Sequence, residues 1–117
     1  MTPPPGPTAL VPPPPGLIHI WRIDLQHAAL LQRAVRLLSP DEAQRARRLR
    51  FEEHRHHFVA GRCAMRLLLG GYTGRDPIAL RFRYGPHGKP ALPAGDDAPE
   101  IRFNFSNSGK HALLAVA

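Results

Sequence analysis

Cysteine, lysine and long apolar runs are all scarce in this chain of 117 residues. The one cysteine, Cys63, excludes an internal disulfide framework and a zinc site built on cysteines. No apolar stretch approaches the roughly 20 residues that cross a bilayer, and residues 1–16 lack the basic and apolar regions of a signal peptide. The length allows one domain at most. We therefore expect a cytoplasmic domain with no membrane partner and with Cys63 as a small core residue.

Positive charge exceeds negative charge, and arginine supplies nearly all of it. Sixteen Lys and Arg face nine Asp and Glu, which gives a formal net charge of +7, and only Lys89 and Lys110 are lysines. Arginine makes bidentate contacts of defined geometry with phosphates and carboxylates. The composition therefore indicates an anionic partner, whether a phosphate compound, a nucleic acid or an acidic protein surface.

Proline is concentrated at the start of the chain, where residues 1–16 contain eight of the fourteen prolines. Proline fixes φ and has no amide donor, so this segment is expected to form neither helix nor sheet. We predict a disordered or polyproline leader over 1–16, either passive or able to dock on an aromatic groove. A single domain follows over 17–117.

Apolar residues alternate in three segments of the domain, which predicts strands at 17–25, 78–84 and 101–105, and a continuous apolar run predicts a fourth strand at 111–117. The last of these ends on ALLAVA, an apolar run without a turn or polar tail behind it. Such a strand is either central in its sheet or is followed by further chain, and we favour the second interpretation. Polar turns or loops are expected at 86–90, 93–99 and 106–110.

Helical spacing and capping signals predict three helices. Apolar residues three and four apart predict one helix at 28–38. Ser39 and Glu42 form a capping-box signature around a proline, which predicts a second helix over 40–50. A longer helix is expected over 53–69, ended by the glycine pair that follows it. The pattern predicts an α+β fold in which a small antiparallel sheet packs on a long helix.

Arginines recur along one face of the long helix. Arg55, Arg62 and Arg66 are seven and four residues apart, which places them in a narrow arc, and Arg45 and Arg48 extend the charge along the preceding helix. Two interpretations remain open. The arginines form either a solvated face balanced by nearby acids or a site for a phosphate or diphosphate.

Two short polar segments could also bind an anion. At 88–90, Gly allows close backbone approach to a ligand, Lys supplies a compact charge and Pro makes the turn rigid. At 106–109, hydroxyl, amide and backbone donors could form a nest for an anion, although a turn that satisfies its own backbone is the simpler interpretation. The histidines at 54, 56 and 57 lack the i, i+4 spacing typical of metal-binding helices.

Taken in order, these segments resemble a known family. The motifs IHIWRIDL, SPDEAQRARRLRF, HHFVAGRCAMRLLL, GKP and FNFSNSG, which cover Leu17–Ala117, are similar to those of the two-lobed, Sfp-like 4′-phosphopantetheinyl transferases. The resemblance implies that 17–117 is the N-terminal lobe of a pseudo-duplicated fold. It also implies transfer of the phosphopantetheine arm of coenzyme A to a serine of an acyl or peptidyl carrier protein, with Mg²⁺ and with release of adenosine 3′,5′-bisphosphate.

The resemblance also implies roles for particular residues. Eight of them would contact coenzyme A: Arg45, His57 and Arg62 at its phosphates, Gly88, Lys89 and Pro90 on its adenine side, and Ser106 and Asn107 at its 3′-phosphate.

Two departures from the family pattern stand out. The family usually has His at the position of Asn107, and an amide cannot supply the positive charge of an imidazolium. The metal-binding motif Gly-x-Asp-x-Glu would follow Ala117, and 101–117 contains no acid at all. We therefore expect that no metal ligands lie in this chain, that a second lobe or chain completes the site, and that the chain alone is weakly active or inactive. A non-catalytic remnant and an Arg-rich nucleic-acid-binding module are the alternatives.

Overall fold

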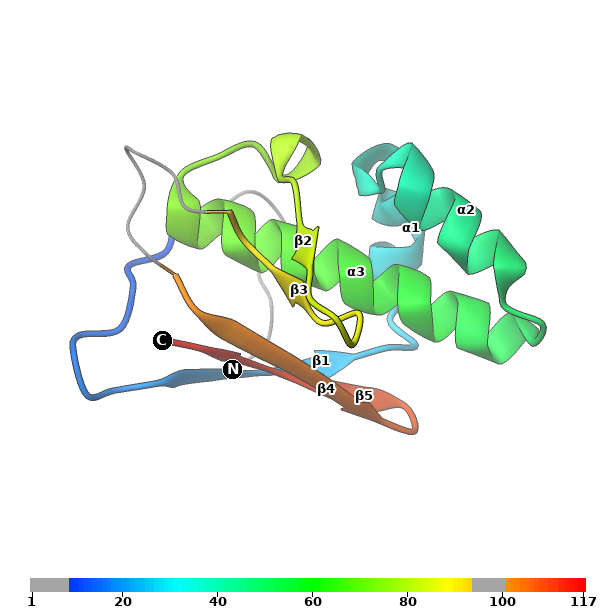
Figure 1. The fold of residues 1–117 in the computed structure, drawn as a ribbon. Helices are drawn as coiled ribbons and strands as arrows, with labels where there is room; N and C mark the ends of the chain where they lie inside the picture. The colour runs from blue at the N-terminus through cyan, green and yellow to red at the C-terminus, as the bar shows by residue number, and fades with distance from the viewer. Residues whose placement is uncertain (1–8, 94–100) are drawn as a thin grey trace.

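A three-stranded antiparallel sheet covers one side of a long helix in the computed structural model, which describes residues 9–93 and 101–117 (Figure 1). The sheet order is β1-β5-β4. The main elements are β1 (His19–Asp24), α3 (Glu52–Thr73), β4 (Phe103–Ser108) and β5 (His111–Val116). The predicted α+β class, with a small sheet on a long helix, is confirmed.

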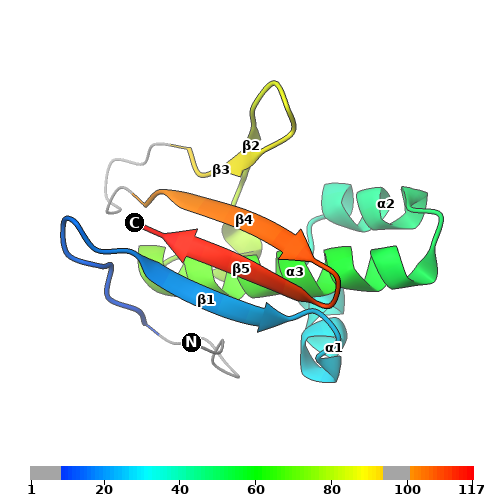
Figure 2. The ribbon, with the colours of Figure 1, turned by 90° about the horizontal axis from the view of Figure 1, so that it is seen from below.

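Two shorter helices and a small hairpin complete the described fold. They are α1 (Ala28–Leu37), α2 (Pro40–Arg48), the 3₁₀ helix η1 (Pro77–Ala79), and the strands β2 (Arg83–Tyr84) and β3 (Pro90–Ala91). Helices α1 and α2 pack against α3, while the β2–β3 hairpin lies beside the sheet (Figures 1 and 2). None of the described helices is both long and apolar enough to span a membrane.

The core lies between the sheet and α3. Successive strand residues point to opposite faces, and one face carries Trp21, Ile23, Leu114 and Val116, all of which are buried. They pack against the apolar side of α3, which includes Leu68. Strand β5 pairs with β1 on one side and with β4 on the other. The apolar run at the end of the sequence is therefore the central strand of the sheet.

Helix α3 is longer than the sequence indicated. The glycine pair at 70–71 does not end it; the helix continues to Thr73 and ends at Gly74, whose φ of +70° is the left-handed conformation typical of a helix C-terminus. At Gly70 the missing side chain leaves room for the segment that returns after the helix, because a Cβ there would lie 2.9 Å from the Arg75 carbonyl oxygen. This glycine is needed for packing and not for a turn.

The predicted strand at 78–84 is mostly wrong. Residues 77–79 form the 3₁₀ helix η1, with a proline in its first turn and with the Asp76 carboxylate accepting from the Ile78 amide at 3.1 Å. Only Arg83 and Tyr84 pair with another strand. The alternation of apolar residues had suggested a longer ladder, but a proline and its cap start a helical turn instead. The predicted loop at 93–99 falls, beyond Pro93, outside the described residues.

The predicted turn at 106–110 is also largely wrong. Residues 106–108 belong to β4, paired with Leu113, Ala112 and His111 of β5. The turn between these strands consists of Gly109, with a φ of +60°, and Lys110. Backbone amides that alternate along a strand do not form the nest of converging donors that an anion would need.

The described part of the proline-rich leader is docked on the domain. Residues 9–16 contain no helix or strand, as predicted. The Leu10 amide nevertheless donates to the Gly71 carbonyl at 3.0 Å, and the Leu10 side chain packs against the core. Leu10 thus ties this segment to the C-terminal end of α3.

Candidate functional site

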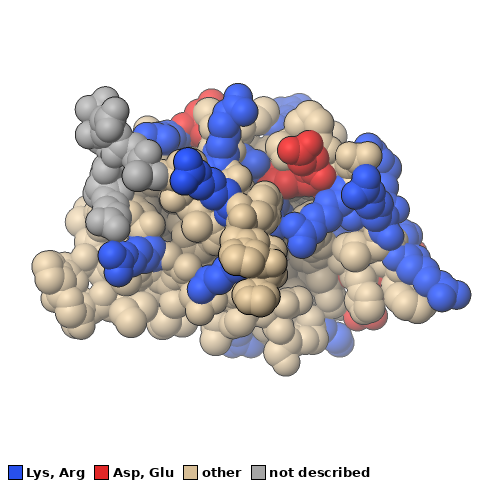
Figure 3. Space-filling model, in the orientation of Figure 1, with Lys and Arg blue, Asp and Glu red and all other residues tan. Residues whose placement is uncertain are grey.

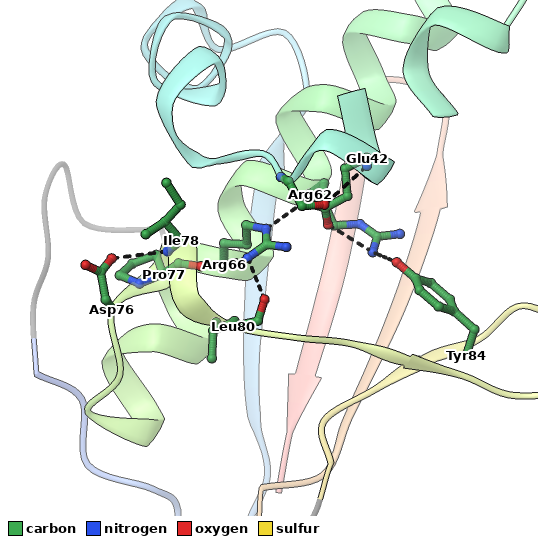
Figure 4. Close-up of polar contacts among 9 residues, drawn as sticks. Glu42, Arg62, Arg66, Asp76, Pro77, Ile78, Leu80 and Tyr84 are labelled. Atoms are coloured by element: carbon green, nitrogen blue, oxygen red, sulfur yellow. Dashed lines mark hydrogen bonds and ion pairs between the residues drawn. The ribbon is translucent and has the colours of Figure 1, made fainter. Parts of the chain in front are cut away.

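A buried cluster of one carboxylate and two guanidiniums lies where α2 crosses α3 (Figure 4). The Glu42 carboxylate accepts from Arg66 Nε at 2.7 Å and from Arg62 Nη1 at 3.3 Å. The three residues are 2%, 2% and 7% exposed for Glu42, Arg66 and Arg62. Because two cations share one anion, the cluster carries one positive charge in excess within the fold.

The same two arginines connect further elements. Arg66 Nη1 donates to the carbonyl oxygens of Pro77 and Leu80, at 2.7 and 2.9 Å, and so holds η1 against α3. Arg62 Nη1 donates to the Tyr84 hydroxyl at 2.7 Å, which joins β2 to the helices. The cluster therefore fixes the relative positions of α2, α3, η1 and the β2–β3 hairpin.

Glu42 also caps its own helix. Its Oε1 accepts from the Ser39 amide at 3.0 Å, and its amide donates to the Ser39 hydroxyl at 3.2 Å. This is the capping box predicted from the sequence, and it is confirmed. What sequence reasoning missed is that the capping carboxylate is also the counterion of Arg62 and Arg66, whose spacing of four residues places both guanidiniums toward α2.

The arginine stripe divides into buried and exposed members. Arg62 and Arg66 are buried and paired with Glu42, so these two form neither a solvated face nor an open phosphate site. Arg55 donates through Nη1 to the carbonyl oxygens of Leu49 and Arg50, at 2.7 and 3.0 Å. Arg62, which was expected at the coenzyme phosphates, is 7% exposed and donates to the Tyr84 hydroxyl.

The cation in front of this cluster is Arg45 of α2, which is exposed. Its guanidinium carbon lies 5.5 Å from the Phe58 ring centroid and 5.7 Å from the Tyr84 ring centroid. Arg62 contacts the same two rings, at 5.2 and 5.7 Å. Such cation–π contacts hold a guanidinium in place without neutralising it. Among the described residues no carboxylate lies within 4 Å of Arg45, so its charge is available to an external anion.

The β2–β3 hairpin carries the predicted GKP turn. Tyr84 pairs with Pro90, the Gly85 amide donates to the Lys89 carbonyl at 3.1 Å, and Gly88 has a φ of +75° that favours glycine. Tyr84, Lys89 and Pro90 line a groove of about 1140 Å³, together with Arg81, Arg83 and apolar residues. Tyr84 thus connects the arginine cluster to a groove that contains Lys89. Figure 3 shows this side of the molecule, where basic side chains are prominent.

His57 lies elsewhere on α3. Its side chain is about 10% exposed, and its Nε2 atom has no hydrogen-bond partner; the nearest carboxylate, Glu53, is 3.9 Å away. It borders a separate cavity of about 320 Å³ with Leu25 and Gln26. The structure therefore does not place His57 in the groove of Lys89.

Ser106 and Asn107 are exposed and consecutive in β4, so their side chains point to opposite faces of the sheet. The Phe105 ring packs beside Gly61, which puts Phe105 and Asn107 on the α3 side and Ser106 on the outer side. Neither residue borders the groove of Lys89. The strand separates the two side chains that were expected to share one phosphate.

Two other chemistries find no support in the described residues. No three His, Cys, Asp or Glu side chains in 9–93 and 101–117 lie close enough together to hold a metal ion. Cys63 is fully buried, as predicted, and burial raises the pKa of its thiol to about 11. A thiol of that pKa is protonated at neutral pH and is not a nucleophile.

Residues 24–117 match the sequence profile of a family described as 4′-phosphopantetheinyl transferase, N-terminal. The chain belongs to this family. It is 44% identical to the 4′-phosphopantetheinyl transferase HetI of Nostoc sp., over 91% of this chain and 48% of that protein. It is 29% identical to the 4′-phosphopantetheinyl transferase Sfp of Bacillus subtilis, over 72% of this chain and 36% of that protein. The family resemblance drawn from the motifs is therefore confirmed.

A third similar protein is a phosphopantetheinyl transferase of Thraustochytrium sp., 30% identical over 86% of this chain and 36% of that protein. The chain thus spans between a third and a half of the length of these transferases. Within the matched segment lie the buried cluster, Arg45 and the GKP hairpin.

Proposed function

We propose that this chain forms the coenzyme A-binding half of a 4′-phosphopantetheinyl transferase that modifies a serine of an acyl or peptidyl carrier protein. The observation that carries the proposal is the connection made by Tyr84. Its hydroxyl binds Arg62, its ring contacts Arg45, and it borders the groove of Lys89. Two exposed cations suit a diphosphate and a nucleotide base: Arg45, which lies over aromatic rings, and Lys89, which borders the same groove as Tyr84.

In this proposal Arg45 and Lys89 contribute positive charge to the coenzyme phosphates, and Gly88 and Pro90 border the adenine. His57 and Asn107, on the α3 side of the sheet, are candidates for a second phosphate contact, and Ser106 is a candidate from the outer face. Arg62 is a positioning residue, since its hydrogen bond fixes Tyr84.

The proposed reaction breaks one phosphoanhydride bond. The carrier serine oxygen forms a bond to the phosphorus of the phosphopantetheine arm, adenosine 3′,5′-bisphosphate leaves with the bridging oxygen, and the serine proton passes to a base. Among the described residues that line the groove of Lys89 there is no Asp or Glu, and the one histidine is His87, in the turn of the β2–β3 hairpin. We assign the base and the metal to a second half of the enzyme, and the reaction to the cytoplasm.

The outer face of the sheet is where we place that second half. Figure 2 views the sheet from this side. Ile18 is 61% exposed, and Ile20 and Leu113 lie about half exposed on adjacent strands. Exposed apolar clusters of this kind are typical of interfaces. The relatives that match are two to three times as long as the matched segment, which provides the chain to cover it.

Isothermal titration calorimetry tests the coenzyme site. We expect coenzyme A to bind, adenosine 3′,5′-bisphosphate to bind more weakly, and pantetheine without phosphates not to bind. Replacing Arg45 by Glu should lower the affinity for coenzyme A by roughly tenfold or more, because a charge-assisted contact becomes repulsive. Replacing Arg36 by Glu, at the exposed end of α1, is the matched control. Undetectable binding of coenzyme A at millimolar concentration would contradict the proposal.

A second assay tests whether this chain alone catalyses the transfer. Incubated with coenzyme A, Mg²⁺ and an apo acyl carrier protein, the chain alone should cause negligible mass gain on the carrier. Robust transfer would show that no second half is needed. Binding of duplex DNA that falls steeply with salt, without any binding of coenzyme A, would favour the nucleic-acid alternative.

A further inference from the structure

Four exposed residues form a basic, aromatic surface at the turn between α2 and α3. We call this surface the α2–α3 corner; it consists of Arg47, Arg48, Arg50 and Phe51. Among the described residues no carboxylate lies within 4 Å of these guanidiniums. Lys and Arg side chains dominate the right-hand end of Figure 3, where the corner of Figure 1 lies. The site of Arg45 and Lys89 does not include these residues.

Contacts order the connection and two of the four side chains, those of Arg50 and Phe51. Arg55, near the start of α3, donates to the carbonyl oxygens of Leu49 and Arg50. These bonds hold the backbone that connects α2 to α3. The guanidinium of Arg50 lies 5.5 Å from the Phe51 ring centroid, and the His54 ring meets Phe51 edge-on at 5.4 Å. Side chains ordered in this way, here those of Arg50 and Phe51, lose little conformational entropy when a partner binds.

Helix stability alone does not account for these residues. Arg47 and Arg48, in the last turn of α2, interact favourably with the helix dipole. Arg50 and Phe51 lie beyond that helix. Phe51 is the N-cap of α3, a position where Ser, Thr, Asp or Asn would accept a backbone hydrogen bond, and its side chain makes none. A 57% exposed phenylalanine thus occupies a position where a capping residue would stabilise the fold.

We propose that the α2–α3 corner docks an acidic, amphipathic helix of the carrier protein. This inference rests on the proposed function, which requires such a partner. The three arginines complement carboxylates. Phe51 supplies an apolar anchor, and a few aromatic side chains of this kind carry much of the binding energy in interfaces. Arg45 lies one turn of α2 before Arg48. A carrier docked at the corner is therefore held next to the proposed coenzyme site.

Binding of an apo acyl carrier protein, measured by calorimetry at 50 and 300 mM NaCl, tests the proposal. The double replacement R47E/R48E should weaken binding by roughly tenfold or more at low salt and by less at high salt, because screening reduces the charge term. Phe51→Ser should also weaken binding by roughly tenfold while raising Tm, since it restores an N-cap. A structural role for Phe51 predicts the opposite change in Tm. Arg36→Glu is the matched control and should change the affinity less than twofold.

The outcomes separate docking from the coenzyme site. Corner variants that bind coenzyme A normally but bind the carrier weakly support the proposal. Carrier binding with no coenzyme A binding would remove the proposed function and leave the docking surface. Three results would each overturn the proposal. The first is an unchanged carrier affinity in both R47E/R48E and Phe51→Ser, and the second is no carrier binding by the unmodified protein. The third is binding of duplex RNA at the corner in place of the carrier.

Discussion

Trp21 donates its indole N–H to the Tyr72 hydroxyl across 2.8 Å, and both side chains are buried. On the other side of that hydroxyl lies Nδ1 of His19, 2.6 Å away, so the hydroxyl can accept from Trp21 while donating to His19. The rings of Trp21 and Tyr72 meet edge-on, with centroids 6.4 Å apart. One phenol therefore joins β1 to the last turns of α3.

Replacing Tyr72 by Phe should destabilise the domain by about 1–3 kcal/mol, because the buried indole N–H of Trp21 loses its acceptor. Urea unfolding followed by circular dichroism measures the free energy. In the Trp21→Phe background the same replacement should cost less, since no donor is then left unsatisfied. Equal costs in the two backgrounds would mean that the hydrogen bond contributes nothing.

Replacing Glu42 by Gln should destabilise the domain by about 3–5 kcal/mol, because the two arginines then lie buried without a counterion. Helix α2 also loses the charged half of its capping box. Asp41→Asn is the matched control, since Asp41 is the exposed neighbour and should cost under about 1 kcal/mol as a helix-dipole contact. Similar midpoints for the two variants in urea would contradict a buried ion pair.

Replacing Gly61 by Ala should destabilise the domain by about 1–3 kcal/mol through overpacking. The new Cβ would lie 2.8 Å from Cζ of Phe105. Alanine favours a helix over glycine by about 1 kcal/mol. Whether Gly61→Ala lowers or raises the free energy of unfolding therefore depends on the clash with Phe105. In the Phe105→Leu background the replacement should become neutral or stabilising. If it destabilises both backgrounds equally, Phe105 is not the obstacle.

Stability should fall between about pH 9 and pH 11 because of Cys63, whose thiol has a usual pKa of 9.0 that burial raises to about 11. The folded state holds this proton more tightly than the unfolded state, so the contribution is complete below pH 9 and is lost as the pH rises through 11. Two pKa units correspond to about 3 kcal/mol.

The Cys63→Ala variant isolates this contribution. Burial also raises the pKa of Tyr72, which weakens the fold in the same direction at high pH. Cys63→Ala keeps the Tyr72 contribution and removes the thiol, so its stability should fall less between pH 9 and pH 11. Parallel curves for the two proteins would show that the thiol is not protected by burial.

The parts of the fold that follow from local patterns were predictable. Alternation located β1, an apolar run located β5, and the Ser39–Glu42 capping box located the start of α2. The glycine pair of α3 misled the prediction because Gly70 leaves room for close packing against the chain that returns after the helix, and no local pattern shows that contact. The alternation of apolar residues over 78–84 likewise predicted a strand, whereas Pro77 and its N-cap Asp76 start the 3₁₀ helix η1.

The candidate site was predictable in kind but not in geometry. The GKP turn and the exposed Arg45 were found from sequence. The burial of Arg62 depends on a carboxylate twenty residues earlier in the chain, and spacing along one helix cannot reveal which face another helix covers. The role of Tyr84 depends on the hairpin folding back over α3, so no local pattern indicated it.

The pairing of β1 with β5 has a consequence for biosynthesis. Helices can form while the chain is still emerging from the ribosome, because their contacts are local. The first strand, however, must wait for the last described strand before it has a neighbour, and β4 also needs β5. A nascent chain halted before residue 111 therefore exposes an unpaired apolar strand, and chaperones that recognise such strands would be its first partners.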